Sequence, residues 1–347
     1  EITTRLVGSE MCIRDRLSTA VIMSASMLVG CGNNKSKENT DKSFKIGMVA
    51  DIGGINDESF NQSAWEGLQK AEKDFGIEVK VIESKQASEY LQNMESLLDE
   101  DVDMVIGVGY TMKEDIEKQA KNYPDKQFVL IDETYDSIPE NVTPILFREN
   151  EAAYLTGLVA GKMTENNNVG FIGGIQTPVI SRFEYGYKAG VKEANKDCNV
   201  NVQYAGTFSD AAKGKSIANQ MYGNGSDIIL AAAGGTGLGS IESAKEQNKY
   251  AIGVDRDQSD LAPKNVLTSA LKKVNVGVYD TVKEFVEGKL TGGQEKVYGL
   301  KEDGVGIPET TKNLVPQDII DYVNSMIEKI KNDEIKVPVN EEEYKSM

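Results

Sequence analysis

Short apolar runs alternate along most of the chain with longer segments in which apolar residues recur at helical spacing. The runs, which we expect to be strands, are residues 44–50, 78–83, 104–108, 127–132, 142–147, 169–174, 200–207, 227–233, 250–254 and 266–271. Apolar strands that alternate with amphipathic helices are typical of a parallel sheet covered by helices on both faces. The pattern therefore predicts an α/β protein.

The series of strands and helices restarts at residue 169, which favours two similar Rossmann-like lobes over one long sheet. We expect the first lobe to comprise residues 44–148 plus about 274–298, and the second to comprise residues 149–265 plus about 299–332. The segments that cross back between the lobes would form a hinge. The last residues, 333–347, are an acidic tail whose end we expect to be frayed.

The first predicted strand leads into a stretch that carries candidate chemistry. Ser59 and Gln62 fit an S-x-x-Q capping box, which predicts that a helix begins there. Phe60 and Asn61 would lie on its first turn, near Asp51, at the carboxyl end of the strand. Open α/β sheets bind ligands at this edge. An aromatic ring and an amide beside a carboxylate are suited to holding a flat polar molecule.

Charge and composition exclude several classes of function. The chain has 347 residues, a formal net charge of -17 and no histidine. The charge argues against a nucleic-acid partner, because phosphate contacts need clustered Lys and Arg. Without histidine, Ser-His-Asp and Cys-His catalysis and His-ligated metal sites are excluded. Chemistry based on carboxylates alone stays open, and we expect no cofactor, no metal site and no catalytic residue.

The residues before the first strand resemble a bacterial export leader. An apolar run at 17–29 follows Arg14 and Arg16 and is too short to span a bilayer. It ends in Leu-Val-Gly-Cys at residues 28–31, which resembles a lipobox. The resemblance implies cleavage before Cys31 and lipidation of its thiol, with palmitate among the acyl groups. An ordinary secretory signal with a chance cysteine is the alternative.

Residues 1–30 would thus be a leader with a signal peptide, and the polar residues 31–43 a flexible tether. The acyl chains would hold the protein on the extracytoplasmic face of the cell membrane. Residues 1–16 begin without methionine and carry acidic residues where a basic region is expected. We interpret them as a translated adapter sequence, and the alternative is a divergent but genuine leader.

Several motifs, taken together and in order, resemble the basic membrane protein family of bacterial substrate-binding lipoproteins of ABC transporters. They are Asp51-x-Gly-Gly, Ser59-Phe60-Asn61-Gln62, Gly107-Val108-Gly109, Gly234-Gly235-Thr236-Gly, Gly253-Val254-Asp255-x-Asp257-Gln258 and Thr268-Ser269-x-Leu271-Lys272. The resemblance runs from about Lys45 to Ile330. It implies a type I periplasmic-binding-protein fold that binds a nucleoside between its lobes, acts as a monomer and delivers the ligand to ABC permease subunits. We expect a purine nucleoside: guanosine, inosine or adenosine.

The resemblance also implies which residues contact the base. Phe60 and Phe208 would stack on its two faces, although Phe183 could supply the second ring instead. Asn61 and Asp132 would form hydrogen bonds with its edge, with Asp51 nearby. Stacking of a base on an aromatic ring contributes roughly 1–3 kcal/mol per ring.

The ribose would be held by a second set of residues. Asp255 and Lys272 would bind its hydroxyls, and Gly234 and Gly235 would let the backbone approach closely. A carboxylate that accepts hydrogen bonds from ribose hydroxyls is also used in dinucleotide sites. An acidic cleft would repel phosphate, which favours nucleosides over nucleotides.

Two other functions stay open on the residues alone. The same fold could bind another small ligand, such as a sugar or a signalling molecule, because sugars also stack on aromatic rings. The protein could also be a nucleoside hydrolase that uses its aspartates. The missing histidine and the lipobox count against the hydrolase.

Overall fold

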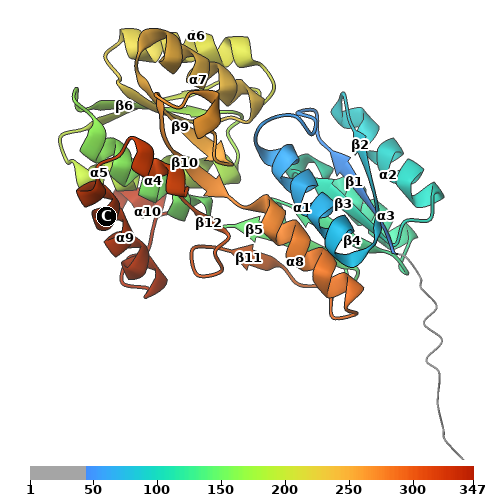
Figure 1. Ribbon diagram of the computed structural model, residues 1–347. Coiled ribbons are helices and arrows are strands. Elements are labelled where there is room, and N and C mark those ends of the chain that lie inside the picture. The colour runs from blue at the N-terminus through green and yellow to red at the C-terminus, as the bar shows by residue number, and fades with distance from the viewer. Residues whose placement is uncertain (1–43) are drawn as a thin grey trace, which may run out of the picture. The chain divides into compact units, whose positions relative to one another are not determined.

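Two six-stranded sheets organise the computed structural model, which describes residues 44–347 (Figure 1). The first sheet has the order β11 (Lys296–Tyr298), β5 (Val142–Phe147), β4 (Gln127–Ile131), β3 (Met104–Val108), β1 (Lys45–Ala50) and β2 (Glu78–Glu83). The second has the order β12 (Val305–Gly306), β10 (Val266–Lys272), β9 (Tyr250–Asp255), β8 (Ile228–Ala232), β6 (Asn168–Gly173) and β7 (Asn199–Tyr204). The two orders correspond strand for strand, and among these strands only the β10–β12 pair is antiparallel. The predicted fold of two Rossmann-like lobes is confirmed.

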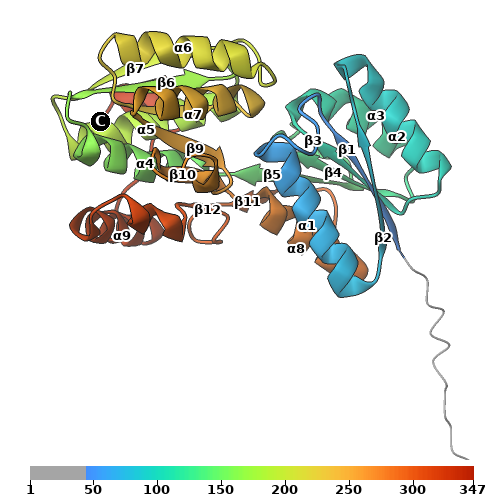
Figure 2. The same cartoon turned by 45° about the horizontal axis from the view of Figure 1, so that its top comes forward.

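Helices cover both faces of each sheet (Figures 1 and 2). The first lobe is the first sheet with α1 (Phe60–Phe75), α2 (Tyr90–Asp99), α3 (Lys113–Asn122) and α8 (Val274–Val286). The second lobe is the second sheet with α4 (Glu149–Met163), α5 (Pro178–Ala194), α6 (Ala211–Gly223), α7 (Gly235–Gln247) and α9 (Gln317–Lys331). Side chains alternate across a strand, so Met48 packs in the core shared with α1 while Val49 packs with α2 and α3.

The chain passes between the two sheets after β5, after β10 and after β11. Helix α4 follows β5 but packs against β10, and α8 follows β10 but packs against α1. These passages bring Glu149, at the start of α4, close to Lys272, at the end of β10. The connections between the lobes therefore border the region where the carboxyl ends of both sheets meet.

The end of the chain differs from the expectation of a frayed tail. Residues 341–345 form the short helix α10 (Glu341–Lys345), which Asn340 caps and which packs against α5. The ring centres of Tyr344 and Tyr185 lie 5.9 Å apart, and Val337 is 4% exposed. The amide of Asn150 donates a 2.8 Å hydrogen bond to the carbonyl of Val337. Buried apolar contacts and these bonds hold the tail on the second lobe, which its acidic composition did not reveal.

No helix within residues 44–347 is long and apolar enough to cross a membrane. The predicted leader, the lipidation of Cys31 and the tether lie outside the described residues.

Candidate functional site

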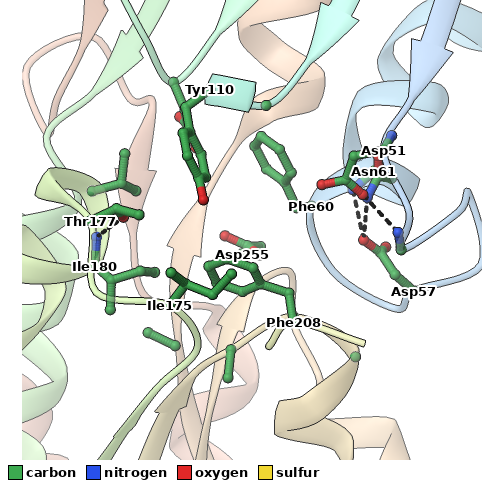
Figure 3. A pocket seen from close by; sticks show the side chains of 18 of the residues that line it. Asp51, Asp57, Phe60, Asn61, Tyr110, Ile175, Thr177, Ile180, Phe208 and Asp255 are labelled. Atoms are coloured by element: carbon green, nitrogen blue, oxygen red, sulfur yellow. Dashed lines mark hydrogen bonds between the residues drawn. The ribbon is translucent and has the colours of Figure 1, made fainter. Parts of the chain in front are cut away.

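A cavity lies between the two lobes, at the carboxyl ends of both sheets (Figure 3). Its volume is about 140 Å³, which is room for roughly ten water molecules, so it fits a small molecule. All ten residues that were predicted to bind the ligand line it: Asp51, Phe60, Asn61, Asp132, Phe183, Phe208, Gly234, Gly235, Asp255 and Lys272. The structure thus brings these residues together from both halves of the chain.

The start of α1 is fixed by Asp57 and not by the predicted capping box. The Asp57 carboxylate accepts hydrogen bonds from the backbone amides of Ser59 (2.9 Å), Asn61 (2.9 Å) and Gln62 (3.1 Å). Ser59 makes no capping bond, because its hydroxyl donates to Asp255 in the other lobe. A cap two residues earlier satisfies the free amides equally well. It releases Ser59 to join the lobes.

Asn61 positions Asp51 at the cavity wall. Its side-chain amide donates to Asp51 Oδ1 (2.7 Å) and Asp57 Oδ2 (2.9 Å), and its carbonyl oxygen accepts from the Asp51 backbone amide (3.0 Å). Burial raises the pKa of Asp51, and hydrogen bonds from Gly53 and Asn61 oppose this rise. Both side-chain amide hydrogens of Asn61 are already donated, so Asn61 has no free donor for a ligand. The Asp51 carboxylate therefore provides much of the capacity to accept hydrogen bonds at this wall.

Lys272 lies at the centre of a buried charge network. Its ammonium group donates to Asp132 Oδ2 and lies 3.7 Å from Glu149, which accepts a 2.6 Å bond from Arg182 Nε. Burial alone would lower the pKa of Lys272, but Asp132, Glu149 and Asp255 raise it, so the lysine stays charged. Asp132 Oδ1 is buried and has no hydrogen-bond partner among residues 44–347. Such an oxygen is costly to leave unpaired and is available to a ligand donor.

Asp132 and Asp255 occupy corresponding places in the two lobes. Asp132 follows β4 and Asp255 ends β9, and these strands have the same position in their sheets. Both residues have left-handed backbone conformations, with φ of 72° and 63°. This conformation is unfavourable for residues other than glycine, and strain of this kind is concentrated at functional sites. In both residues this backbone conformation directs the carboxylate into the same cavity.

Asp255 is a buried carboxylate with a shifted titration. Burial raises its pKa to about 6, with smaller upward contributions from Asp57 and Asp132, while Lys272 and the Ser59 hydroxyl oppose the rise. The residue is 7% exposed. It is therefore charged at neutral pH but close to its titration range.

Aromatic side chains enter the cavity from several elements. Phe60 comes from α1, Phe183 from α5 and Phe208 from the loop after β7. The Lys272 ammonium lies 4.5 Å from the centre of the Phe60 ring, a cation–π contact. Phe183 is 2% exposed, whereas Phe208 is only partly buried. Figure 3 shows Phe60 and Phe208 on different sides of the cavity, near Asp255.

Tyr110 also lines the cavity, although it was not among the predicted site residues. It projects into the cavity from the turn after β3, across from Ile175 and Thr177 of the second lobe (Figure 3). The preceding Gly109 has φ of 112°, which favours glycine. The sequence signal was the apolar strand that ends in Gly-Val-Gly-Tyr, but the direction of the tyrosine side chain depends on the conformation of the turn.

The arrangement suits a neutral molecule that has flat apolar faces and several hydrogen-bond donors. Among the described residues that line the cavity, the carboxylates of Asp51, Asp57, Asp132 and Asp255 outnumber the one lysine. Within residues 44–347, no group of three or more His, Cys, Asp or Glu side chains is arranged to hold a metal ion.

A pair of parallel-stranded lobes with a cavity between their carboxyl ends is the architecture of the type I periplasmic-binding-protein fold. Residues 44–341 match the model of the Bmp family, described as "ABC transporter substrate-binding protein PnrA-like". The chain belongs to this family. It is therefore a substrate-binding protein of an ABC transporter, which implies a small-molecule ligand, permease partners and an extracytoplasmic location.

Individual relatives support the assignment. The "CD4+ T-cell-stimulating antigen" of Listeria monocytogenes is 39% identical over 93% of this chain and 97% of its own. The "ABC transporter nucleoside-binding protein BmpA" of Lactococcus lactis is 38% identical over 84% of this chain and 90% of its own. A solute-binding protein of an ABC transporter system from Aeropyrum pernix K1 superposes with a TM-score of 0.80 at 27% identity, covering 87% and 96% of the two chains.

Proposed function

We propose that this protein captures purine nucleosides in the cavity between its lobes and delivers them to an ABC permease for import. The observation that carries the proposal is the combination of aromatic rings on different sides with buried carboxylates in one small cavity. The relative from Lactococcus lactis that is named a nucleoside-binding protein supports it.

In this proposal the base stacks on Phe60, with Phe208 as the second ring because it is the more exposed of the two candidates. The unpartnered Asp132 Oδ1 and the Asp51 carboxylate accept hydrogen bonds from the donors at the base edge. Asn61 contributes by holding Asp51 in place.

The ribose hydroxyls bind Asp255 and Lys272, and Gly234 and Gly235 leave space for the sugar. A Cβ at Gly234 would lie 3.2 Å from the carbonyl oxygen of Phe208, so a side chain there would tighten the wall. Hydrogen bonds to ionised groups are roughly twice as strong as neutral ones. A phosphate would meet several buried carboxylates, so we expect nucleotides to be rejected.

A thermal-shift screen of the purified protein tests the ligand. Guanosine, inosine, adenosine, their free bases, ribose and the monophosphates would each be added at the same concentration. A ligand at about a hundred times its dissociation constant stabilises a protein by roughly 2.7 kcal/mol, a shift of several degrees. We expect a shift with purine nucleosides and none with ribose or monophosphates. A shift with a sugar alone would support the alternative ligand class.

The hydrolase alternative needs a separate test, because binding alone does not distinguish it. Incubation with inosine and analysis for free hypoxanthine would reveal hydrolysis. We expect intact inosine after many hours at a stoichiometric protein concentration. Release of the base would replace the transport proposal with an enzymatic one.

We also propose that the protein is a monomeric lipoprotein held on the cell membrane through Cys31. The support is the lipobox-like sequence at residues 28–31 and the polar segment that follows it. Replacement Cys31→Ser should move the protein from the membrane fraction to the soluble fraction. A variant that stays with the membrane would contradict the anchor.

A further inference from the structure

Ion pairs join the lobes beside the cavity. Arg256 of the second lobe binds Glu58 Oε2 through Nη1 at 2.7 Å and Glu66 Oε1 through Nη2 at 2.8 Å, and both glutamates belong to the first lobe. Gln258 donates a 2.8 Å bond to the carbonyl of Glu58. We call Glu58, Glu66, Arg256 and Gln258 the interlobe clasp. These residues lie outside the set that lines the cavity in the described chain.

The clasp is built on the same turn as a proposed ligand-binding residue. Asp255 has φ of 63°, and the Arg256 amide donates a 2.7 Å bond to the carbonyl of Val254. This tight turn sends the carboxylate of Asp255 into the cavity and the guanidinium of Arg256 to the opposite lobe. Gln258 fixes the turn, because its Oε1 accepts a 3.0 Å bond from the Val254 amide.

The other half of the clasp is equally constrained. Glu58 has φ of 51°, and its amide donates a 3.2 Å bond to Gln62 Oε1 on α1. Gln62 also donates a hydrogen bond to Glu66, and Glu66 accepts the hydrogen bond from Arg256 Nη2. The two strained turns, at Glu58 and Asp255, thus meet across the space between the lobes. A ligand that holds Asp255 in place therefore also holds the neighbouring Arg256, whose guanidinium donates hydrogen bonds to the first lobe.

We propose that Arg256 is a positioning residue that holds the two lobes together around the cavity, and so sets ligand affinity and residence time without touching the ligand. Two-lobed binding proteins close around their ligands by hinge motion. The apparent dissociation constant rises when the closed state is less populated. The effect on affinity and residence time rests on the proposed nucleoside-binding function.

The expected effect of breaking the clasp on ligand affinity depends on how exposed its ion pairs are. The Arg256 side chain is 25% exposed, and those of Glu58 and Glu66 are 46% and 40% exposed. Partly exposed ion pairs are weak one by one, but the guanidinium fork engages two carboxylates at once. We expect Arg256→Gln to weaken guanosine binding about three- to tenfold, through faster dissociation.

The chain offers a matched control. Lys215 binds Glu242 at 3.0 Å and Glu246 at 2.9 Å, and its side chain is 28% exposed. This cation also lies between two glutamates, but all three residues belong to the second lobe. Lys215→Gln therefore removes a similar ion pair without affecting the contact between lobes.

The experiment combines two readouts on the wild type, Arg256→Gln, Glu66→Gln, the double variant and Lys215→Gln. The first is the guanosine dissociation rate, followed by stopped-flow fluorescence of Trp65, the only tryptophan of the chain. The second is the radius of gyration without ligand, from small-angle X-ray scattering. Both are measured at low and high salt, because exposed charges are screened by salt.

We expect Arg256→Gln to dissociate faster, to be larger without ligand and to lose the salt dependence of the wild type. Lys215→Gln should match the wild type, and the double variant should match Arg256→Gln. Equal dissociation rates and radii for the wild type and Arg256→Gln would overturn the proposal. If the wild type binds no guanosine, the proposed function fails, and the scattering comparison alone decides on the clasp.

Discussion

The charge of Asp255 should destabilise the folded protein at neutral pH. Burial raises its pKa from 3.8 to about 6, and one pKa unit corresponds to about 1.36 kcal/mol. Holding this carboxylate ionised in the fold therefore costs about 3 kcal/mol at pH 7.5. The replacement Asp255→Asn removes the charge and keeps an oxygen that can accept the hydrogen bond from Ser59. We expect the variant to be more stable than the wild type by up to that amount.

The pH dependence gives the sign of the effect. The folded state binds the proton more tightly than the unfolded state, so the penalty is complete above pH 6. It declines as the pH falls from 6 toward 3.8, because the folded carboxyl group is then protonated. The linkage relation gives a remaining difference of about 1 kcal/mol at pH 4.5. Stability should be measured by urea unfolding at pH 7.5 and pH 4.5.

Asp260→Asn is the control for this experiment. Asp260 lies in the same loop and is exposed, so its replacement should change stability little at either pH. A difference in the free energy of unfolding between wild type and Asp255→Asn that does not narrow at pH 4.5 would show that the charge of Asp255 is not the cause. So would a variant that is less stable than the wild type at pH 7.5.

The same replacement should weaken nucleoside binding. A hydrogen bond to a charged group contributes about 1.5–3 kcal/mol, so we expect a loss of roughly tenfold or more in affinity with guanosine. Wild-type binding should also weaken below pH 6, where Asp255 takes up a proton. Stability and binding would then change in opposite directions, as expected for a residue kept for its function.

Other replacements test the site and its supports. Lys272→Met should reduce the free energy of unfolding by roughly 3–5 kcal/mol, because it leaves buried carboxylates unpaired; Asp132→Asn added to it should restore part of the loss in urea unfolding. Phe60→Leu should weaken guanosine binding by about 1–3 kcal/mol in calorimetry. Gly190→Ala should lower the free energy of unfolding in urea by about 1–3 kcal/mol, because a Cβ there would lie 2.0 Å from a carbonyl oxygen of α4. Gly223→Ala is its control, because a Cβ there meets nothing within 4 Å.

The repeated pattern of strands and helices was sufficient to predict the two-lobed fold. The apolar runs became β1 to β10 close to their predicted bounds, because fully buried strands need continuous apolar sequence. The short strands β11 and β12 were not predicted. They span residues 296–298 and 305–306, too few to produce a periodic signal.

The local details of the site depended on contacts that sequence patterns do not contain. Ser59 has the sequence of a helix cap but bonds to Asp255, which is 196 residues away. Arg256 likewise finds its partners only when the lobes are in place. The residues predicted from the sequence all line the cavity. The position of Tyr110 and the left-handed turns that aim Asp132 and Asp255 could not be predicted.

The cavity should bind a nucleoside and reject its phosphate ester. The most direct test is isothermal titration calorimetry of the purified wild-type protein with guanosine and, separately, with guanosine 5′-monophosphate. We predict saturable binding of one guanosine per chain and no detectable heat from the monophosphate, because the lining carboxylates repel its charge. Equal binding of the two compounds, or no binding of guanosine, inosine or adenosine, would rule out a cavity that selects nucleosides.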